Sequence, residues 1–210
     1  MFKIKYNRSY FDSNINVIAV TKYVSKECLQ EYYDNNYRNF GEDRVDSFLE
    51  KKEFFKKDDI KWHFIGHLQK NKCKKVINEI DYLHSLESIE LAKNINKYAN
   101  KEIKCFIEIN ISNEENKYGI NKEDLFKFYE EVSIYDKIKV IGLMCICENT
   151  DNEEVLNKSF QEMNRLLNEL NNKFNLELKE LSMGMSNDYQ IALKNNATYI
   201  RIGSMLIEEN

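Results

Sequence analysis

The stretch KCFIEINI, residues 104–111, and the later stretch KVIGLMCI, residues 139–146, are near-continuous runs of apolar side chains. A strand that is apolar on both faces is typical of a parallel sheet whose outer face is covered by helices. Before and after these two runs, short β-rich segments alternate with longer amphipathic segments along the whole chain. The expected strands are Val17–Thr21, Asn39–Gly41, Trp62–Gly66, Tyr82–Ser85, Lys104–Ile111, Val140–Ile146, Leu178–Met183 and Tyr199–Gly203.

Helices are expected in the amphipathic segments that separate these strands. Glu153–Phe174 has the clearest apolar face, with apolar residues three or four positions apart. The expected helices are Lys26–Asn35, Arg44–Lys56, Lys70–Glu79, Ile89–Asn100, Lys122–Ser133, Glu153–Phe174 and Asn187–Asn195.

Strand–helix alternation predicts parallel strands joined by right-handed crossovers. Eight such units within about 200 residues suit a closed (β/α)8 barrel better than a doubly wound open sheet, which the pattern also permits. No linker or low-complexity segment divides the chain, so we expect residues 1–210 to form one α/β domain, a TIM barrel.

Composition narrows the range of functions. The 210 residues include 31 basic and 35 acidic side chains, a net charge of −4, with no basic block, which argues against a surface for nucleic acid or anionic membranes. No secretory signal and no apolar run long enough to span a bilayer is found. Five irregularly spaced cysteines indicate a reduced, cytoplasmic protein rather than a disulfide framework. The chain has no proline, so glycine and asparagine must mark its turns.

Three polar signals follow strands that a barrel makes neighbours. Lys22 ends VIAVTK, the stretch LSMGMSND covers residues 181–188, and RIGSM covers residues 201–205. Barrel closure places the eighth strand between the seventh and the first, so the three signals converge at the carboxyl ends of the strands, where such barrels carry their sites.

The residue types at this point of convergence favour an anion and an amine nucleophile. Gly184 and Gly203 allow backbone amides to approach an anion, and three serine hydroxyls add donors: Ser182, Ser186 and Ser204. The loops after the seventh and eighth strands are the usual phosphate site of this barrel. A lysine beside a phosphate suits Schiff-base chemistry, because a desolvated amine loses its proton more readily.

Each signal taken singly also has a purely structural explanation. A lysine at a strand end is more often solvated or salt-bridged, Gly-Ser loops are mostly turns, and Arg201 could simply pair with a carboxylate. His63 and His67 are separated by a strand and Gly66, which argues against a metal pair, and Cys145 and Cys147 read as core residues. We therefore expect no metal site, and only the convergence of the three signals favours function.

Eight motifs occur in the order typical of one family over nearly the whole chain: AVTK, NFGEDRV, WHFIGHLQKNK, LHSLES, EINISNEENKYGI, GLMCI, LSMGMSND and RIGS. In these motifs the chain resembles the pyridoxal-phosphate homeostasis proteins, which are similar to the N-terminal barrel of alanine racemase. The resemblance implies that pyridoxal 5′-phosphate (PLP) is held as an internal aldimine on Lys22. It also implies a monomer that acts in vitamin B6 and amino-acid homeostasis, with PLP-dependent apo-enzymes as possible recipients.

The resemblance also assigns further cofactor contacts. Ser186, Gly203 and Ser204 would hold the phosphate, with Ser182 and Met185 lining that loop. Arg201 would face the pyridine nitrogen, and Met144 would line the ring pocket. An arginine leaves that nitrogen unprotonated, which weakens the cofactor as an electron sink, and the chain ends at Asn210 without the second domain that gives alanine racemase its catalytic tyrosine. Little or no catalysis is therefore expected.

The chain departs from the family pattern at four places. Asp43 stands near the cofactor ring where the family usually has asparagine, and the proline that usually follows the lysine is absent. The carboxyl end lacks the usual Phe-Gly and tail, and the N-terminal helix is shorter than usual, so closure of the barrel between its last and first strands is expected to be thinly covered.

Two other functions stay open from sequence. A weak amino-acid racemase would need a second acid/base opposite Lys22, for which His63 and Tyr118 are the nearest candidates. An interaction protein whose barrel has lost its cofactor is the third reading, and failure to bind PLP would support it.

Overall fold

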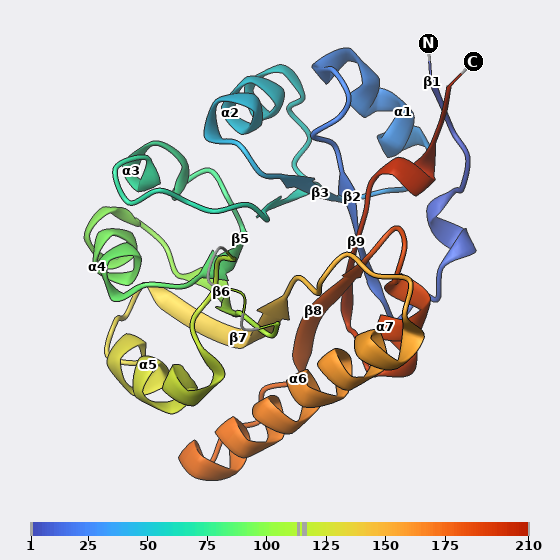
Figure 1. The fold of residues 1–210 in the computed structure, drawn as a ribbon. Helices are drawn as coiled ribbons and strands as arrows, with labels where there is room; N and C mark the ends of the chain where they lie inside the picture. The colour runs from blue at the N-terminus through green and yellow to red at the C-terminus, as the bar shows by residue number, and fades with distance from the viewer. Residues whose placement is uncertain (1, 113, 115–116, 210) are drawn as a thin grey trace.

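Eight parallel strands close into a barrel in the computed structural model, which describes residues 2–112, 114 and 117–209. Each strand pairs with its neighbours in chain order, and the last pairs with the first (Figure 1). The expected (β/α)8 barrel is thus confirmed. The barrel strands are β2 (Asn16–Val20), β3 (Asn39–Glu42), β4 (Lys61–Phe64), β5 (Tyr82–Leu86), β6 (Ile103–Ile109), β7 (Ile138–Cys145), β8 (Glu180–Met185) and β9 (Tyr199–Ile202).

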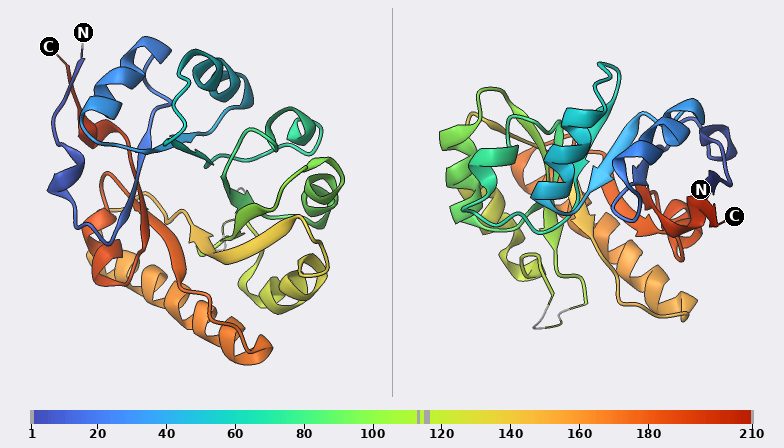
Figure 2. Two further views of the ribbon diagram at one scale, coloured as in Figure 1. Left: turned by 180° about the vertical axis from the view of Figure 1, so that it is seen from behind. Right: turned by 90° about the horizontal axis from the view of Figure 1, so that it is seen from above.

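Helices surround the ring of strands, as the two further views in Figure 2 also show. They are α1 (Leu29–Asp34), α2 (Val45–Phe54), α3 (Cys73–Val76), α4 (Ile89–Tyr98), α5 (Leu125–Val132), α6 (Glu153–Phe174) and α7 (Tyr189–Lys194). Short 3-10 turns precede or replace helical turns at η1 (Arg8–Tyr10), η2 (Lys26–Cys28), η3 (Lys122–Asp124) and η4 (Ser204–Leu206). No helix in the described part of the chain is long and apolar enough to cross a membrane.

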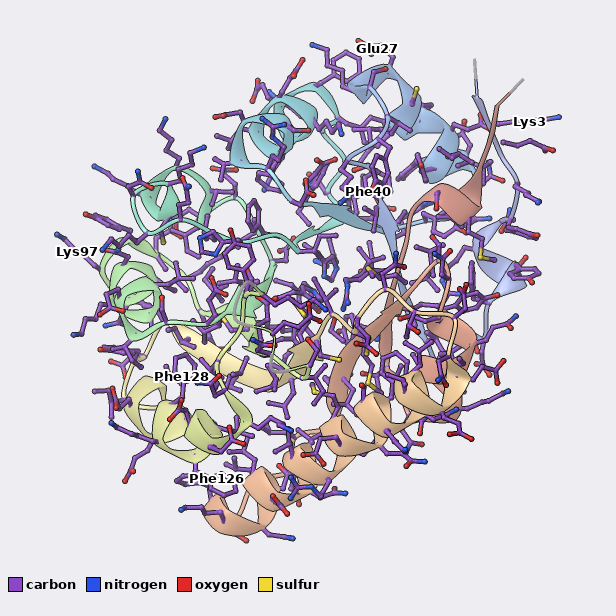
Figure 3. All side chains as sticks on the ribbon, in the orientation of Figure 1. Lys3, Glu27, Phe40, Lys97, Phe126 and Phe128 are labelled. Atoms are coloured by element: carbon purple, nitrogen blue, oxygen red, sulfur yellow. The ribbon has the colours of Figure 1, made fainter. Side chains whose placement is uncertain are left out.

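The core has two parts because barrel strands bury both faces. Side chains that point inward form a small cluster of Ile18, Phe106, Met144 and Tyr199. Side chains that point outward pack against the helices in one large cluster, to which Leu83 and Phe160 belong. Figure 3 shows side chains filling the centre of the ring, with Lys97 at the outer edge on α4. The apolar runs that predicted the fold are therefore apolar because one face fills the barrel and the other meets helices.

Several helices are shorter than the sequence predicts. The segment expected to be helical over Lys70–Glu79 forms only the single turn Cys73–Val76. Tight turns flank it, because the amide of Lys72 donates to the carbonyl of Gln69 and that of Glu79 to the carbonyl of Val76. The carboxyl-terminal part of the expected Lys26–Asn35 helix is α1, and its first turn is the 3-10 turn η2. Such tight turns satisfy amides at helix ends with fewer residues.

The two chain ends form a strand pair that sequence analysis did not anticipate. β1 (Phe2–Ile4) pairs antiparallel with β10 (Ile207–Glu209), and the amide of Lys5 extends the pair by donating to the carbonyl of Leu206 at 2.8 Å. Figure 1 shows the two ends side by side, near α1 and the end of the barrel sheet. A strand and the 3-10 turn η1 thus stand where a short N-terminal helix was expected, next to the junction between β9 and β2.

Candidate functional site

The three polar signals lie at the same end of adjacent strands. Lys22 follows β2, Ser186 follows β8 and Gly203 follows β9. β9 is hydrogen-bonded to β2 on one side and to β8 on the other. The predicted convergence at the carboxyl ends of the strands is therefore confirmed by the barrel's strand order.

Lys22 is held at the barrel mouth by an ion pair. Its Nζ lies 2.9 Å from Oδ2 of Asp43, and 5.0 Å from the centre of the Tyr23 ring. Both charged side chains are about one-third exposed, at 33% and 28%. Burial by itself lowers the pKa of the Lys22 ammonium, but the hydrogen bond and charge of Asp43, with help from Tyr23, outweigh burial and raise that pKa. Lys22 is thus a protonated amine in this state, and Asp43 is its partner.

A buried ion pair fixes the strand end from which Lys22 projects. Nζ of Lys51 lies 2.6 Å from Oε1 of Glu42, and it also donates to the carbonyl of Thr21 at 2.7 Å. The hydroxyl of Thr21 donates to the same Glu42 oxygen. Glu42 has no exposed surface, so the ion pair would be costly to break. Because Lys51 also holds the carbonyl of Thr21, the pair fixes the position from which the following residue, Lys22, extends.

Two backbone amides near the end of β9 converge on one oxygen atom. Oγ of Ser186 accepts from the amide of Gly203 at 3.2 Å and from that of Met205 at 3.4 Å. A Cβ at Gly203 would meet no atom closer than 3.4 Å, so packing alone does not demand glycine there and leaves room beside the amides. Gly184 is different, because its φ of +92° belongs to the left-handed region that favours glycine. The donor set fits an anion such as a phosphate.

Ser204 lies between these two amides in the chain, and Met185 directly precedes Ser186. Ser204 is exposed in the turn η4, while the side chain of Met185 is 38% exposed at the end of β8. The amide of Met185 donates to Oδ1 of Asp188, which tightens the loop before α7. The loop after β8 is therefore held in shape by its own side chains.

Arg201 is buried beneath the mouth, with two of its nitrogens engaged. Nη1 donates to Oγ of Ser182 at 2.7 Å and Nη2 donates to the carbonyl of Cys145 at 2.8 Å. Arg201 is only 4% exposed. Burial lowers the pKa of its guanidinium, and the charge of Asp188 opposes this shift. An arginine keeps its charge even so. Ser182 has no exposed surface, and its hydroxyl faces Arg201 inside the barrel, not the phosphate loop where sequence analysis expected it.

Met144 lies inside the barrel, as a ring-pocket residue would. It is fully buried in the inner cluster and pairs in register with Glu108 of the neighbouring strand.

A cavity of about 310 Å³ opens beside Asp43, and Arg44, His67 and Tyr118 also line it. The mouth thus offers an amine, two converging amides, a buried cation and adjacent space.

Glu108 is a feature that sequence analysis missed. Its Oε2 is buried and has no hydrogen-bond partner among the residues that the structure describes. Burial, with the charge of Glu87, raises the pKa of Glu108 to about 8, although Arg201 opposes the shift. The signal was visible in the sequence as a single acid inside the apolar run 104–111. A carboxyl group that is protonated near neutral pH is therefore part of the barrel interior.

Comparison with known proteins defines the class. The family model "Alanine racemase, N-terminal domain" matches residues 4–210. Among solved structures, alanine racemase from Corynebacterium glutamicum superposes with a TM-score of 0.77 at 12% identity, covering 92% of this chain and 56% of that one, which establishes the shared fold. The protein is thus a barrel of the alanine racemase N-terminal type.

Closer relatives specify the family. The pyridoxal phosphate homeostasis protein of Aquifex aeolicus is 37% identical over 196 residues, 92% of this chain and 86% of the relative, and that of Helicobacter pylori strain J99 is 34% identical over 99% of this chain and 92% of the relative. PipY of Synechococcus elongatus, solved with PLP bound, has a TM-score of 0.87 at 30% identity and 95% coverage of both chains. The chain belongs to the pyridoxal phosphate homeostasis protein family.

Proposed function

We propose that this chain binds PLP covalently through Nζ of Lys22 and acts in PLP homeostasis with little or no catalysis. The observation that carries the proposal is the meeting of Lys22, the amides on Ser186 Oγ and buried Arg201 at the ends of adjacent strands. In the binding step the Lys22 amine, once deprotonated, adds to the cofactor's aldehyde and one water is lost.

The remaining side chains would hold the cofactor without reacting. The amide of Gly203 and the hydroxyls of Ser186 and Ser204 would receive the phosphate, with Met185 beside them. Ser186 Oγ accepts from two backbone amides, and an anion oxygen could take its place as the acceptor from both. Met144 would pack against the ring. Asp43, which pairs with Lys22 in this structure, would lie beside the ring rather than bond the phosphate.

Arg201 favours binding of PLP without catalysis. When bound, PLP supplies an electron sink whose strength depends on protonation of its ring nitrogen. A guanidinium that faces that nitrogen donates a hydrogen bond and cannot supply a proton for transfer at neutral pH. A protein that holds PLP without using it for catalysis can pass it to other proteins. We propose PLP-dependent apo-enzymes as its partners.

The racemase alternative lacks a suitable second acid/base among the candidates from sequence. His63 is fully buried, stacked on Tyr82, and both of its ring nitrogens are hydrogen-bonded inside the barrel. Tyr118 is 59% exposed and stacks on His67 at the rim of the cavity, where water reaches it. Of the two candidates, only Tyr118 is accessible enough to serve as the second acid/base of a racemase.

The first experiment is a visible spectrum of the protein with PLP, followed by borohydride reduction and peptide mapping. We expect a cofactor band and an adduct on Lys22, both lost in Lys22→Ala. Lys26→Ala is the matched control, because Lys26 is a nearby lysine that pairs with Glu50 instead. No band at cofactor concentrations that saturate ordinary PLP proteins would contradict the proposal and favour an interaction protein.

A second experiment separates carrier from enzyme. The PLP-loaded protein is incubated with L-alanine in deuterated water, and exchange at the α-carbon is followed by NMR. We expect no exchange above that of free PLP. Exchange that depends on Lys22 and falls in Tyr118→Phe would instead establish a racemase-type activity.

A further inference from the structure

A chain of hydrogen bonds crosses the barrel interior and ends on Arg201. Oγ of Ser182, which accepts from Arg201, lies 2.8 Å from Nδ1 of His84. Nε2 of His84 lies 3.0 Å from Nδ1 of His63, and Nε2 of His63 lies 3.1 Å from Oδ1 of Asn39. These five residues come from β9, β8, β5, β4 and β3, so the chain links one side of the barrel to the other.

The protons in this chain can point in only one direction. His63 and His84 have no exposed surface, and burial lowers the pKa of His63 to about 3 and that of His84 well below its ordinary value, so each ring is neutral and carries one N–H. An amide oxygen only accepts, so Nε2 of His63 donates to Asn39. Nδ1 of His63 must then accept from His84, and Nδ1 of His84 must accept from the hydroxyl of Ser182.

This direction leaves Ser182 as an acceptor toward Arg201. If Nδ1 of His84 instead donated to Ser182, the hydroxyl proton of Ser182 would have no acceptor among the residues that the structure describes, although the side chain is fully buried. An unsatisfied buried donor is costly, so the arrangement in which every proton has an acceptor is favoured.

Stacking holds the two imidazole rings in place. The ring of His63 lies 4.3 Å from that of Tyr82, at an interplanar angle of 8°, and the ring of His84 lies 4.4 Å from that of Phe106, at 25°. The hydroxyl of Tyr82 accepts from Lys104 and takes no part in the chain. Rings that cannot turn keep the hydrogen-bond order from Asn39 to Arg201 fixed.

We propose that His84 and His63 are positioning residues that act through Ser182 to hold the Arg201 guanidinium in one orientation. With Nη1 on Ser182 and Nη2 on the carbonyl of Cys145, Nε is the nitrogen of Arg201 that makes no hydrogen bond within the described part of the chain. The proposal rests on the proposed function, because Nε then carries an unengaged N–H that can donate to the cofactor's ring nitrogen. Both histidines are fully buried and would act on the cofactor only through Arg201.

The chain itself is tested in the protein without PLP. Nitrogen-15 NMR of the histidine side chains distinguishes the two neutral tautomers. We expect both His63 and His84 to carry the proton on Nε2 and to stay neutral from about pH 5 to about pH 8. A proton on Nδ1 of either ring, or titration of either ring in this range, would overturn the proposed direction. This outcome is independent of whether the protein binds PLP.

The effect on Arg201 is tested with PLP labelled with nitrogen-15 in its ring. We expect the ring-nitrogen signal of the bound cofactor to be insensitive to pH in the unmodified protein and to titrate in His84→Leu, with PLP bound roughly tenfold more weakly. His84→Asn should restore the original signal in part, since its amide oxygen can accept from Ser182. Tyr82→Phe, which removes a neighbouring hydroxyl outside the chain, should change neither.

The outcomes separate the two proposals. A ring-nitrogen signal that is the same in His84→Leu as in the unmodified protein, with only a lower melting temperature, would show that the histidines merely fill space. Ser182→Ala gives the same reading if His84→Leu does not fold. If no PLP binds to the unmodified protein, the proposed function fails, and the tautomer measurement still decides the chain.

Discussion

The charge of Asp43 sets the protonation state of Lys22, the lysine that we propose as the attachment point for PLP. The carboxylate at 2.9 Å keeps the Lys22 amine protonated, and a protonated amine cannot attack an aldehyde. The resemblance described in the sequence analysis leads us to expect an asparagine, not a carboxylate, at this position. If PLP attaches to Lys22 as proposed, Asp43 would slow that attachment in the state that the structure represents.

Replacement of Asp43 by asparagine should speed the attachment of PLP. Without the carboxylate the pKa of Lys22 falls toward or below its ordinary value, and the fraction of free amine at neutral pH rises. Because the pair is partly exposed, we expect a rate increase of roughly threefold at pH 7, measured by stopped-flow absorbance. Asp46→Asn, an exposed carboxylate that lines the same cavity, is the control. Equal rates in both variants would argue against this role of Asp43.

Glu108 makes stability depend on pH in a direction opposite to that of a paired carboxylate. Its pKa is raised from 4.5 to about 8 in the folded protein. As the pH rises through this interval, the unfolded chain loses the proton before the folded one does, so stability is full at low pH and falls toward pH 8. Glu108→Gln removes this dependence, because the amide is neutral at every pH.

Urea unfolding of Glu108→Gln at several pH values measures this effect. We expect the variant and the unmodified protein to be similar near pH 5, and the variant to be more stable by on the order of 2 kcal/mol near neutral pH. The exposed Glu123→Gln is the control. A difference in stability that does not change with pH would mean that the folded protein holds Glu108 ionised.

At the scale of elements, α6 is the helix whose ends are most clearly specified. Oδ1 of Asn152 accepts from the amides of Glu154 and Val155 at 3.0 and 3.4 Å, and Asn175 ends the helix in the left-handed conformation at φ +51°. Six buried side chains face the barrel: Leu156, Phe160, Met163, Leu166, Leu167 and Leu170. The predicted bounds of this helix, Glu153–Phe174, are confirmed to the residue.

Loss of the N-terminal cap should destabilise the protein without affecting the site. Asn152→Ala leaves two amides at the start of α6 without their acceptor, and we expect it to lower the free energy of unfolding by about 1 kcal/mol. Lys158→Ala, an exposed position on the same helix, should be close to neutral. Chemical denaturation measures both variants. Equal effects would indicate that water replaces the cap at no cost.

Sequence patterns predicted the strands and the residues at their ends, because both can be recognised from a few consecutive residues. Lys22, Ser186 and Gly203 follow apolar runs directly, and barrel closure alone brings them together. The direction of the Ser182 side chain was predicted incorrectly and the buried Glu108 was not predicted at all, because the direction of a side chain inside a barrel depends on the pairing register. That register shifts between Cys105 and Phe106 and again along β8, which no local pattern records.

At the scale of the whole molecule, the contacts that sequence could not predict join distant segments. The histidine chain draws on five strands, and each of its members alone resembles an ordinary core residue. The pair β1–β10 joins three residues near each end of the chain, segments too short to show a period. Both features depend on closure of the barrel, which brings residues together only after the whole sheet has formed.

The neighbouring ends make this barrel a candidate for circular permutation. Phe2 pairs in register with Glu209, so a short flexible peptide could join the ends without drawing them together across the molecule. New ends could open at the exposed turn between Lys57 and Asp58, which precedes β4 and so lies at the end of the barrel opposite to Lys22. We expect such a permutant to fold and to bind PLP as the parent does, and calorimetry with PLP titration would measure both. Permutation would then change the order in which the strands are synthesised while preserving their arrangement in space.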